Sequence, residues 1–391
     1  MSYATVKLGE YIDILSGFAF KSKDFTDTGI PVIKIKNVQP PYVTLEDLSY
    51  VPDDIAEKSQ KFLLQYNDVL IALTGSHINQ MASVVGRIAR VKYSLPSLLN
   101  QRVGKITSKN NALCDIDFVY YYLSQNKVKI QLAREAGGAA NQANISPSDV
   151  KKLEIPFPCI EIQRRIAGTL SAYDNLIENN QKQIKLLEEA AQRLYKEWFV
   201  DLRFPGYETT PVVDGVPEGW RNGKLLEIAE FRRGKTITKS QIITGNVPVV
   251  AGGLEPAYYH NKANTTAPVI TVSGSGANAG FTRIYHTNVF ASDCSFVDIN
   301  STSYVYFVFC FLKESKAVLE SLQKGSAQPH VYAKDINTLP LLIPDSKCIE
   351  RFIAITAPLF TKIQKKEEQS NIAKEARDRL LSKLMSGEIE V

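Results

Sequence analysis

Long apolar runs are missing from this sequence. No stretch approaches the roughly 18 apolar residues that a membrane-spanning helix needs, and the opening residues, MSYATVKLGEY, lack the apolar segment of a signal peptide. Cysteine is also scarce: the five cysteines (114, 159, 294, 310 and 348) are scattered and form no CxxC pair. An odd, dispersed set argues against a disulfide framework or a zinc site, so we expect a cytoplasmic protein without membrane contacts.

Acidic residues are absent from one long window and nearly absent from another. No Asp or Glu occurs in the 46 residues from Val69 to Cys114, where the overall content of 41 acids in 391 residues predicts about five, and 231–292 contains only Glu255. Both windows keep their basic residues, although the net charge of the chain is only +5. Such a basic face is typical of binding to a nucleic-acid backbone, although the general scarcity of acids in strands explains part of the pattern.

The chain contains two related halves. Residues 7–33 align without a gap on 224–250, and LIALTGS at 70–76 resembles VITVSGS at 269–275. A period of about 190 residues is far too long for a solenoid and indicates a domain duplication. The two acid-poor windows overlap when the halves are aligned, so a basic face is predicted in each half.

Each half is predicted to be a small mixed α/β domain. Short β-rich runs are broken by Gly, Pro and Asn turns, and a helix follows at 117–136 and again at 303–323. We expect glycines to end these helices, Gly137-Gly138 in the first half and the vicinity of Gly325 in the second. Residues 201–219, which are rich in Pro, Gly and Thr, are predicted to be a linker.

A long charged helix is predicted at the end of each half. In 161–199, seam positions alternate spacings of four and three, as in a coiled coil, and include Tyr173, Ile177, Asn180, Ile184, Leu187, Ala191, Leu194 and Trp198. Asn180 is the type of seam residue that fixes register or partner. The corresponding positions of the second helix are more polar: Ile363, Lys366, Ser370, Ala373, Arg377, Leu380 and Leu384.

The length of these helices indicates how they pack. A helix of roughly 55 Å is longer than a small domain is wide, so two of them most easily pack on each other. The alternative is that each helix packs only on its own domain. We predict a mixed α/β (α+β) fold with two repeated globular domains joined by two long antiparallel coiled-coil helices about a pseudo-two-fold axis. The expected boundaries are domains at 1–158 and 220–344, helical regions at 159–200 and 345–391, and the linker at 201–219.

Candidate DNA-binding residues lie in the acid-poor windows and in polar loops beside them. Arg, Lys, Asn, Gln, Ser and His side chains can read base edges, although a single Asn or Gln in a loop is more often a turn residue. The candidates of the first half are Lys34, Lys36, Ser76, Asn79, Arg87, Arg90, Lys92, Arg102, Lys105, Asn141 and Gln142. Those of the second half are Arg232, Arg233, Lys235, Lys239, Lys262, Ser275, Asn278, Arg283, His286, Gln328 and His330.

Two motifs suggest enzyme chemistry but have simpler explanations. Gln39-Pro40-Pro41-Tyr42 is similar to the tetrapeptide with which adenine methyltransferases hold a flipped-out base, yet its counterpart at 255–259 loses the Pro-Pro pair, and a turn explains both. The glycines at 274, 276 and 280 suggest a nucleotide-binding loop, which should open a helix, but β-like residues follow them. We therefore expect no catalytic residue, cofactor site or metal site in this chain.

The repeated plan resembles the specificity (S) subunits of type I restriction–modification systems. The likeness lies mainly in LEIPFPCIEIQRRIAGTLSAYDNLIENNQKQIKLLEEAAQRLYKEWF at 153–199 and in 339–360 and 380–391. The opening KLGEYIDILSGFAFKSKDF is also similar to the start of a target-recognition domain in that family. One departure is Glu350, which stands where the first half has Gln163.

The resemblance implies a division of labour. Two target-recognition domains would each read half of a bipartite, asymmetric site in double-stranded DNA. The helices would set the spacing and dock two methyltransferase (M) subunits, which bind S-adenosylmethionine and methylate adenine at N6; restriction (R) subunits can join and cleave DNA with ATP. Two alternatives stay open: a stand-alone S-adenosylmethionine-dependent adenine DNA methyltransferase that uses Gln39-Pro40-Pro41-Tyr42, and a structural coiled-coil adaptor without DNA binding.

Overall fold

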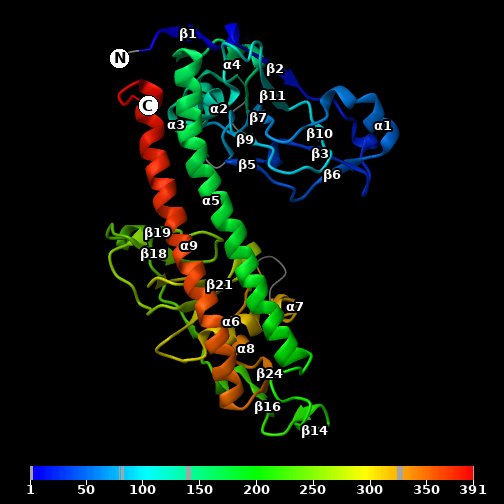
Figure 1. The fold of residues 1–391 in the computed structure, drawn as a ribbon, viewed down its shortest axis with the longest axis vertical. Helices are drawn as coiled ribbons and strands as arrows, with labels where there is room; N and C mark the ends of the chain where they lie inside the picture. The colour runs from blue at the N-terminus through cyan, green and yellow to red at the C-terminus, as the bar shows by residue number, and fades with distance from the viewer. Residues whose placement is uncertain (1–2, 79, 81–82, 138–141, 324–328, 391) are drawn as a thin grey trace. The chain divides into compact units, whose positions relative to one another are not determined.

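The computed structural model describes residues 3–78, 80, 83–137, 142–323 and 329–390. The chain divides into two compact units: unit 1 contains 1–177 and 372–391, and unit 2 contains 178–371. Each unit takes one end of each long helix, α5 (Ile160–Tyr195) and α9 (Ser346–Ser386) (Figure 1). None of the helices in the described ranges has the length and apolar character that crossing a bilayer requires.

Unit 1 is built around a six-stranded mixed sheet of order β2-β11-β7-β9-β5-β4. The bounds are β2 Ile12–Ser16, β4 Val38–Gln39, β5 Tyr42–Val43, β7 Val69–Ala72, β9 Ile88–Arg90 and β11 Val103–Ser108. All four residues of β7 are buried, and they alternate between two cores. Val69 and Ile71 face the core beside the helices, whereas Leu70 and Ala72 face the opposite core, as the period of two in a strand requires.

Smaller elements complete unit 1. A three-stranded sheet has the order β10-β3-β6, and two short pairs join β1 to β13 and β8 to β12. The bounds are β1 Thr5–Lys7, β3 Ile30–Ile33, β6 Ser49–Val51, β8 Thr74–Gly75, β10 Leu98–Leu99, β12 Ala143–Asn144, β13 Glu154–Pro156, α1 Asp53–Lys58 and α4 Pro147–Lys151.

Unit 2 repeats much of this plan around a four-stranded antiparallel sheet of order β17-β23-β20-β21. Its bounds are β17 Arg232–Arg233, β20 Val269–Ser273, β21 Thr282–Tyr285 and β23 Cys294–Asp298. A second sheet has the order β19-β18-β22, and β16 pairs with β24. These bounds are β16 Arg221–Lys224, β18 Val247–Val250, β19 Tyr258–His260, β22 Phe290–Ala291, β24 Pro340–Ile343 and α8 Ala333–Asn337.

Strand pairing confirms the duplication. The edge pair β1–β13 corresponds to β16–β24, and the run β2-β11-β7-β9 corresponds to β17-β23-β20-β21. The parallel contact of Val32 with Leu98 recurs as that of Val249 with Phe290. Each half is therefore the small mixed α/β domain that the sequence predicts.

The predicted domain helices are each split in two. In place of 117–136, the structure has α2 (Ile116–Ser124) and α3 (Asn126–Glu135), and in place of 303–323 it has α6 (Val305–Glu314) and α7 (Lys316–Ser321). The first break falls at Gln125, whose backbone is extended and whose side-chain amide donates to the carbonyl of Tyr122. The predicted glycine cap is also wrong, because α3 ends before an extended Ala136. Gly138 and Gly325 lie outside the described residues.

The long helices form part of the core of both units. In unit 1, Leu170 of α5 and Leu384 of α9 share one core with α2. In unit 2, Tyr195 of α5 and Trp198, in the π-helical turn Lys196–Val200, pack on Phe352 of α9. The two segments run antiparallel within each unit (Figure 1). The alternative that each helix packs only on its own domain is therefore wrong, whereas the two-fold relation between the units stays a prediction.

The segment predicted as a linker has structure of its own. It contains a hairpin of β14 (Val212–Val213) and β15 (Val216–Pro217). Phe204 packs against Trp220 with ring centroids 4.6 Å apart, and both rings are buried in the core of unit 2.

Candidate nucleic-acid interface

Two of the predicted DNA-binding arginines lie inside unit 1. Arg87 and Arg90 are only 7% and 6% exposed. Arg87 donates to the carbonyl of Ile35 at 3.0 Å and to Oε1 of Gln39 at 3.2 Å, and burial lowers the pKa of its guanidinium. We correct the prediction for Arg87, because a buried charge that already has protein partners holds the fold together.

Arg90 receives the same correction. Its guanidinium lies 4.0 Å from the centre of the Tyr120 ring and 3.0 Å from a carboxylate oxygen of Asp117. The cation–π contact and the ion pair together compensate the loss of water. Arg90 therefore fastens β9 to α2 and leaves little surface for a phosphate.

Several other predicted residues of unit 1 also have protein partners. Lys105 pairs with Asp68 at 2.6 Å, Lys36 with Asp47 at 3.5 Å, and Lys34 donates to Ser49 at 2.8 Å. Ser76 is buried and donates to the carbonyl of Gln80, so it shapes a turn. Lys92 lies over the ring of Tyr66, and Gln142 is exposed. Asn79 and Asn141 lie outside the described residues.

A polar cluster forms where β7 and β11 meet the pair β8–β12. Thr74 donates from Oγ1 to Oδ1 of Asn144 at 2.8 Å, and Nη1 of the exposed Arg102 reaches the same two oxygens at 3.4 and 3.3 Å. These long contacts are weak, so Arg102 can exchange them for contacts to a ligand. Thr74 and Asn144 were not among the predicted residues; the signal that could have found them is the pairing of LTGS with NQANIS.

Unit 2 has a related cluster around Ser275. The hydroxyl of Ser275 donates to Oδ2 of Asp293, and its backbone pairs with that of His330. The ring of His330 stacks on Tyr332 with centroids 5.8 Å apart. A cavity of about 190 Å³ is lined by Arg233, Gly274, Asp293, Cys294, Ser295, His330, Val331, Tyr332 and Ala333. Asp293 was not among the predicted residues, although it is the first acid after the acid-poor window 231–292.

The other predicted residues of unit 2 divide between surface and core. Arg232, Arg233, Lys235, Lys239 and Lys262 are exposed, and Arg232 pairs with Glu230. Arg283 donates to the carbonyl of Leu254 and lies 3.7 Å from Glu255. Gln328 lies outside the described residues.

His286 is buried, and Nδ1 lies 3.1 Å from Oε2 of Glu367 in α9. We correct the prediction for His286, because this ring attaches the domain to a helix and is not available to a base.

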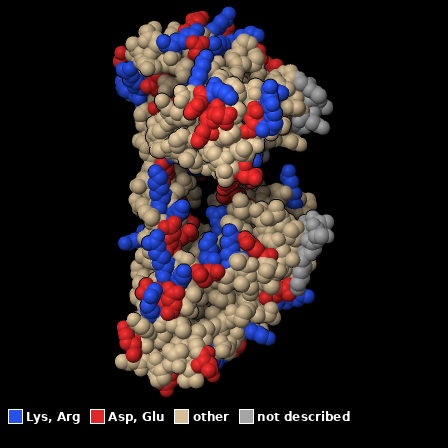
Figure 2. All heavy atoms as spheres, turned by 90° about the vertical axis from the view of Figure 1, so that its right-hand side faces the viewer, with Lys and Arg blue, Asp and Glu red and all other residues tan. Residues whose placement is uncertain are grey.

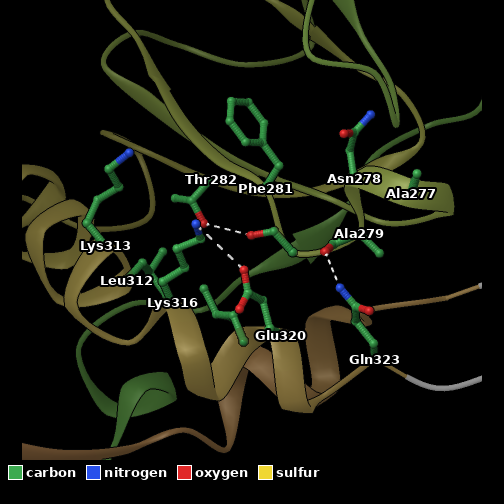
Figure 3. A pocket seen from close by; sticks show the side chains of 12 residues that line it. Ala277, Asn278, Ala279, Phe281, Thr282, Leu312, Lys313, Lys316, Glu320 and Gln323 are labelled. Atoms are coloured by element: carbon green, nitrogen blue, oxygen red, sulfur yellow. Dashed lines mark hydrogen bonds and ion pairs between the residues drawn. The ribbon is translucent and has the colours of Figure 1, made fainter. Parts of the chain in front are cut away.

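A larger cavity lies beside Asn278. It has a volume of about 300 Å³ and is formed by the turn after β20, the start of β21 and helices α6 and α7 (Figure 3). Its polar groups are largely occupied, because Lys316 pairs with Glu320 and Gln323 donates to the carbonyl of Ala279. The glycine-rich loop leads through a single turn of 3-10 helix, Gly276–Asn278, into β21, as the β-like residues after it predict, and not into an α-helix.

The methyltransferase-like tetrapeptide forms a tight turn between β4 and β5. Gln39 uses its amide nitrogen to donate to the carbonyl of Lys36 and its amide oxygen to accept from Arg87. The carbonyl of Pro41 accepts from the backbone N–H of Arg90 at 3.0 Å and from the hydroxyl of Tyr120 at 3.3 Å. The side-chain amide of Gln39 and the carbonyl of Pro41 are thus engaged within unit 1 and hold a turn.

Charge is more mixed than the two acid-poor windows suggest. Figure 2 shows Lys and Arg interspersed with Asp and Glu, and no broad field of one sign covers that face. Among the described residues, no three His, Cys, Asp or Glu side chains gather into a possible metal site. The candidate interface therefore consists of the polar clusters and the exposed basic residues beside them.

Comparison with known proteins gives a consistent result. A family model described as the type I restriction modification DNA specificity domain matches residues 2–189 and 217–371. The type I restriction enzyme MjaIX specificity subunit of Methanocaldococcus jannaschii is 27% identical over 340 residues, which cover 78% of this chain and 76% of that protein. The putative MjaX specificity subunit of the same organism is 23% identical over 98% of this chain and 93% of its own.

The fold is also found in a solved structure. The type I restriction–modification S subunit from M. genitalium aligns with a TM-score of 0.60 at 18% identity, over 98% of this chain and 96% of that one.

Proposed function

Since the chain belongs to the type I restriction–modification DNA specificity family, we propose that unit 1 and unit 2 each read one half of a bipartite site in double-stranded DNA. The observation that carries this proposal is the recurrence of a polar cluster at the same place in both sheets. In unit 1 it contains Thr74, Arg102 and Asn144, and in unit 2 it contains Ser275, Asp293 and His330. Two clusters of different composition suit two different half-sites.

The long helices are proposed to dock the catalytic partners. Large apolar side chains stay exposed on both helices: Leu176 (43%) and Leu186 (64%) on α5, and Ile355 (50%) and Ile372 (69%) on α9. Other residues of α5 and α9 already fill the two cores, so these exposed apolar side chains are available for contact with a protein partner. We propose two methyltransferase (M) subunits, which bind S-adenosylmethionine and methylate adenine at N6, and in some complexes restriction (R) subunits.

The chain itself is proposed to be non-catalytic and to bind no cofactor. The turn at Gln39–Tyr42 supports this, because its amide and carbonyl groups hold β9 and α2 in place. Isothermal titration of the chain alone with S-adenosylmethionine should show no binding. Measurable binding would favour the alternative of a stand-alone methyltransferase.

An exchange of the first domain tests whether the two units read their half-sites independently. Residues 1–150 are replaced by the first domain of another family member, and methylated adenines are mapped with the partner subunits present. One half of the methylated motif should change and the other should stay. A change in both halves would refute independent reading, and a wild-type complex that shows no salt-sensitive binding to DNA would favour the adaptor alternative.

The helices are proposed to set the spacing between half-sites. Leu187 and Ile363 belong to the same core of unit 2, so four residues inserted after each would lengthen both helices together. Such an insertion adds about 6 Å and roughly 40° beyond one turn. We expect the same two half-sites with the spacer changed by about one base pair. An unchanged spacer with methylation retained would show that the helices do not set this distance.

A further inference from the structure

The two polar clusters contain one pair of structurally equivalent residues whose side chains have opposite charges. The backbone N–H of Gly17 donates to the carbonyl of Val103, and that of Gly234 donates to the carbonyl of Cys294. These matching bonds make Val103 and Cys294 equivalent, so the residues just before them are equivalent as well. Those residues are Arg102 in unit 1 and Asp293 in unit 2.

The residue before each of these two glycines also differs between the units. Ser16 precedes Gly17, whereas Arg233 precedes Gly234. Unit 2 therefore places a carboxylate in a cavity that Arg233 also lines, and no ion pair within 4.0 Å joins Asp293 to a basic side chain among the described residues. An acid in this place repels phosphate, so its partner must be a hydrogen-bond donor.

The carboxylate of Asp293 is held in a fixed orientation. Its Oδ2 accepts from the hydroxyl of Ser275, and its backbone carbonyl accepts from the N–H of Gly274 at 3.3 Å. Its Oδ1 accepts no hydrogen bond from any residue in the described ranges. One oxygen is thus fixed by the protein while the other is available for a ligand, and an orientation set in advance lowers the cost of binding.

The geometry points to Asp293 as the residue with which unit 2 reads a cytosine. In the major groove cytosine presents its N4 amine, which can donate a hydrogen bond to a carboxylate oxygen of Asp. Guanine presents two acceptors, N7 and O6, which a carboxylate repels. Arg233, which is exposed and also lines the cavity, supplies the positive charge that a neighbouring phosphate requires. This inference rests on the proposed function, since it names the base that one recognition domain selects.

The test uses the complex with its methyltransferase subunits and maps methylated motifs for Asp293→Asn and Asp293→Ala. Asp293→Asn keeps an acceptor for Ser275, so it should fold even if Asp293→Ala does not. We expect discrimination in favour of cytosine at one position of one half-site to fall about 5- to 100-fold, with the other half-site unchanged.

Matched variants distinguish a loss of base discrimination from a general loss of folded protein. Ser275→Ala should cause a smaller loss at the same position, Arg233→Ala should weaken binding without altering the motif, and Arg102→Ala should leave that position unchanged. An unchanged motif in Asp293→Asn, a uniform loss at every position, or a relaxed position that was not cytosine would overturn the inference. A wild-type complex without any bipartite motif would instead refute the proposed function.

Discussion

The two units attach their domains to the same pair of helices through different chemistry. In unit 1, the hydroxyl of Tyr121 donates to Asp174 of α5 at 2.6 Å, and Asp174 also pairs with Arg377 of α9 at 2.6 Å. In unit 2, the contact is between His286 and Glu367 of α9, near the half-buried Glu188 of α5. An arginine keeps its charge at every physiological pH, whereas a carboxyl group whose pKa is raised by burial, such as that of Glu188, changes its charge at a higher pH than an exposed one does.

The protonation states follow from burial and neighbours. Burial lowers the pKa of Arg377, but the hydrogen bonds and charges of Asp174 and Asp378 outweigh this and raise the pKa above its usual range. Burial, together with the charge of Asp174, raises the pKa of the Tyr121 hydroxyl, which therefore remains a donor. Burial also raises the pKa of Glu188. Arg377 and Tyr121 therefore keep their protons in unit 1, whereas in unit 2 the carboxyl group of Glu188 holds its proton to a higher pH than an exposed glutamate does.

Removal of the central carboxylate of unit 1 should have the largest effect. Asp174→Ala leaves Arg377 half-buried without its main partner, which should lower the free energy of unfolding of unit 1 by about 3 kcal/mol. Urea unfolding followed by circular dichroism measures the change. Asp378→Ala is the matched control, since that partner is 53% exposed and its loss should cost less than about 1 kcal/mol. Equal losses in the two variants would contradict the central role of Asp174.

Loss of the histidine should have an intermediate effect. His286→Ala removes a buried ring that lies near Phe360 and Tyr306, and should lower the free energy of unfolding of unit 2 by about 2 kcal/mol. Glu367→Gln keeps the packing and removes only the charge. If Glu367→Gln leaves the free energy of unfolding unchanged, the attachment of unit 2 depends on packing and not on an ion pair.

The smallest effect is expected at Glu188 and depends on pH. Because its pKa is raised in the folded state, the stability it contributes is full below the unfolded pKa, near 4.3, and is lost as the pH rises through the folded pKa. Glu188→Gln removes this loss and should raise the stability of unit 2 at pH 7 by less than about 1 kcal/mol.

Thermal unfolding from pH 4 to pH 8 measures the effect of Glu188→Gln. Lys313, Arg283, His286 and Glu367 also act on this carboxyl group, and burial is the largest influence. Glu189→Gln, at the more exposed neighbouring position, should leave the pH profile unchanged. A profile that Glu188→Gln does not alter would mean that Glu188 is solvated.

Features that repeat along the sequence could be predicted from it, whereas the burial of single charged side chains could not. The duplication and the long helices are confirmed, because they follow from periodicities that persist over many residues. The burial of Arg87 and Arg90 could not be predicted, because a scarcity of acids shows composition but not the direction of a side chain. Ile88 and Arg90 lie on the same face of β9, and both are buried. Arg90 is accepted there only because Asp117 and Tyr120, distant in sequence, compensate its charge.

The breaks in the domain helices were missed for a related reason. Gln125 and Ser315 are ordinary residues within helical patterns, and neither is glycine or proline. The amide of Gln125 turns back to the carbonyl of Tyr122, a local alternative to the next helical hydrogen bond. Asp293 was missed because only the folded chain brings it together with Ser275 and His330.

Each long helix contributes residues to both units. As a result, the two units finish folding in the opposite order to that in which their first residues are translated. Unit 2 is one continuous segment, 178–371, whereas unit 1 needs 372–391 to complete its core. Leu384 and Met385 are each 1% exposed within that core. During synthesis from the N-terminus, the ribosome must therefore deliver all of unit 2 before unit 1 can close. The first domain to be translated is the last to be completed, and its apolar surface needs protection until then.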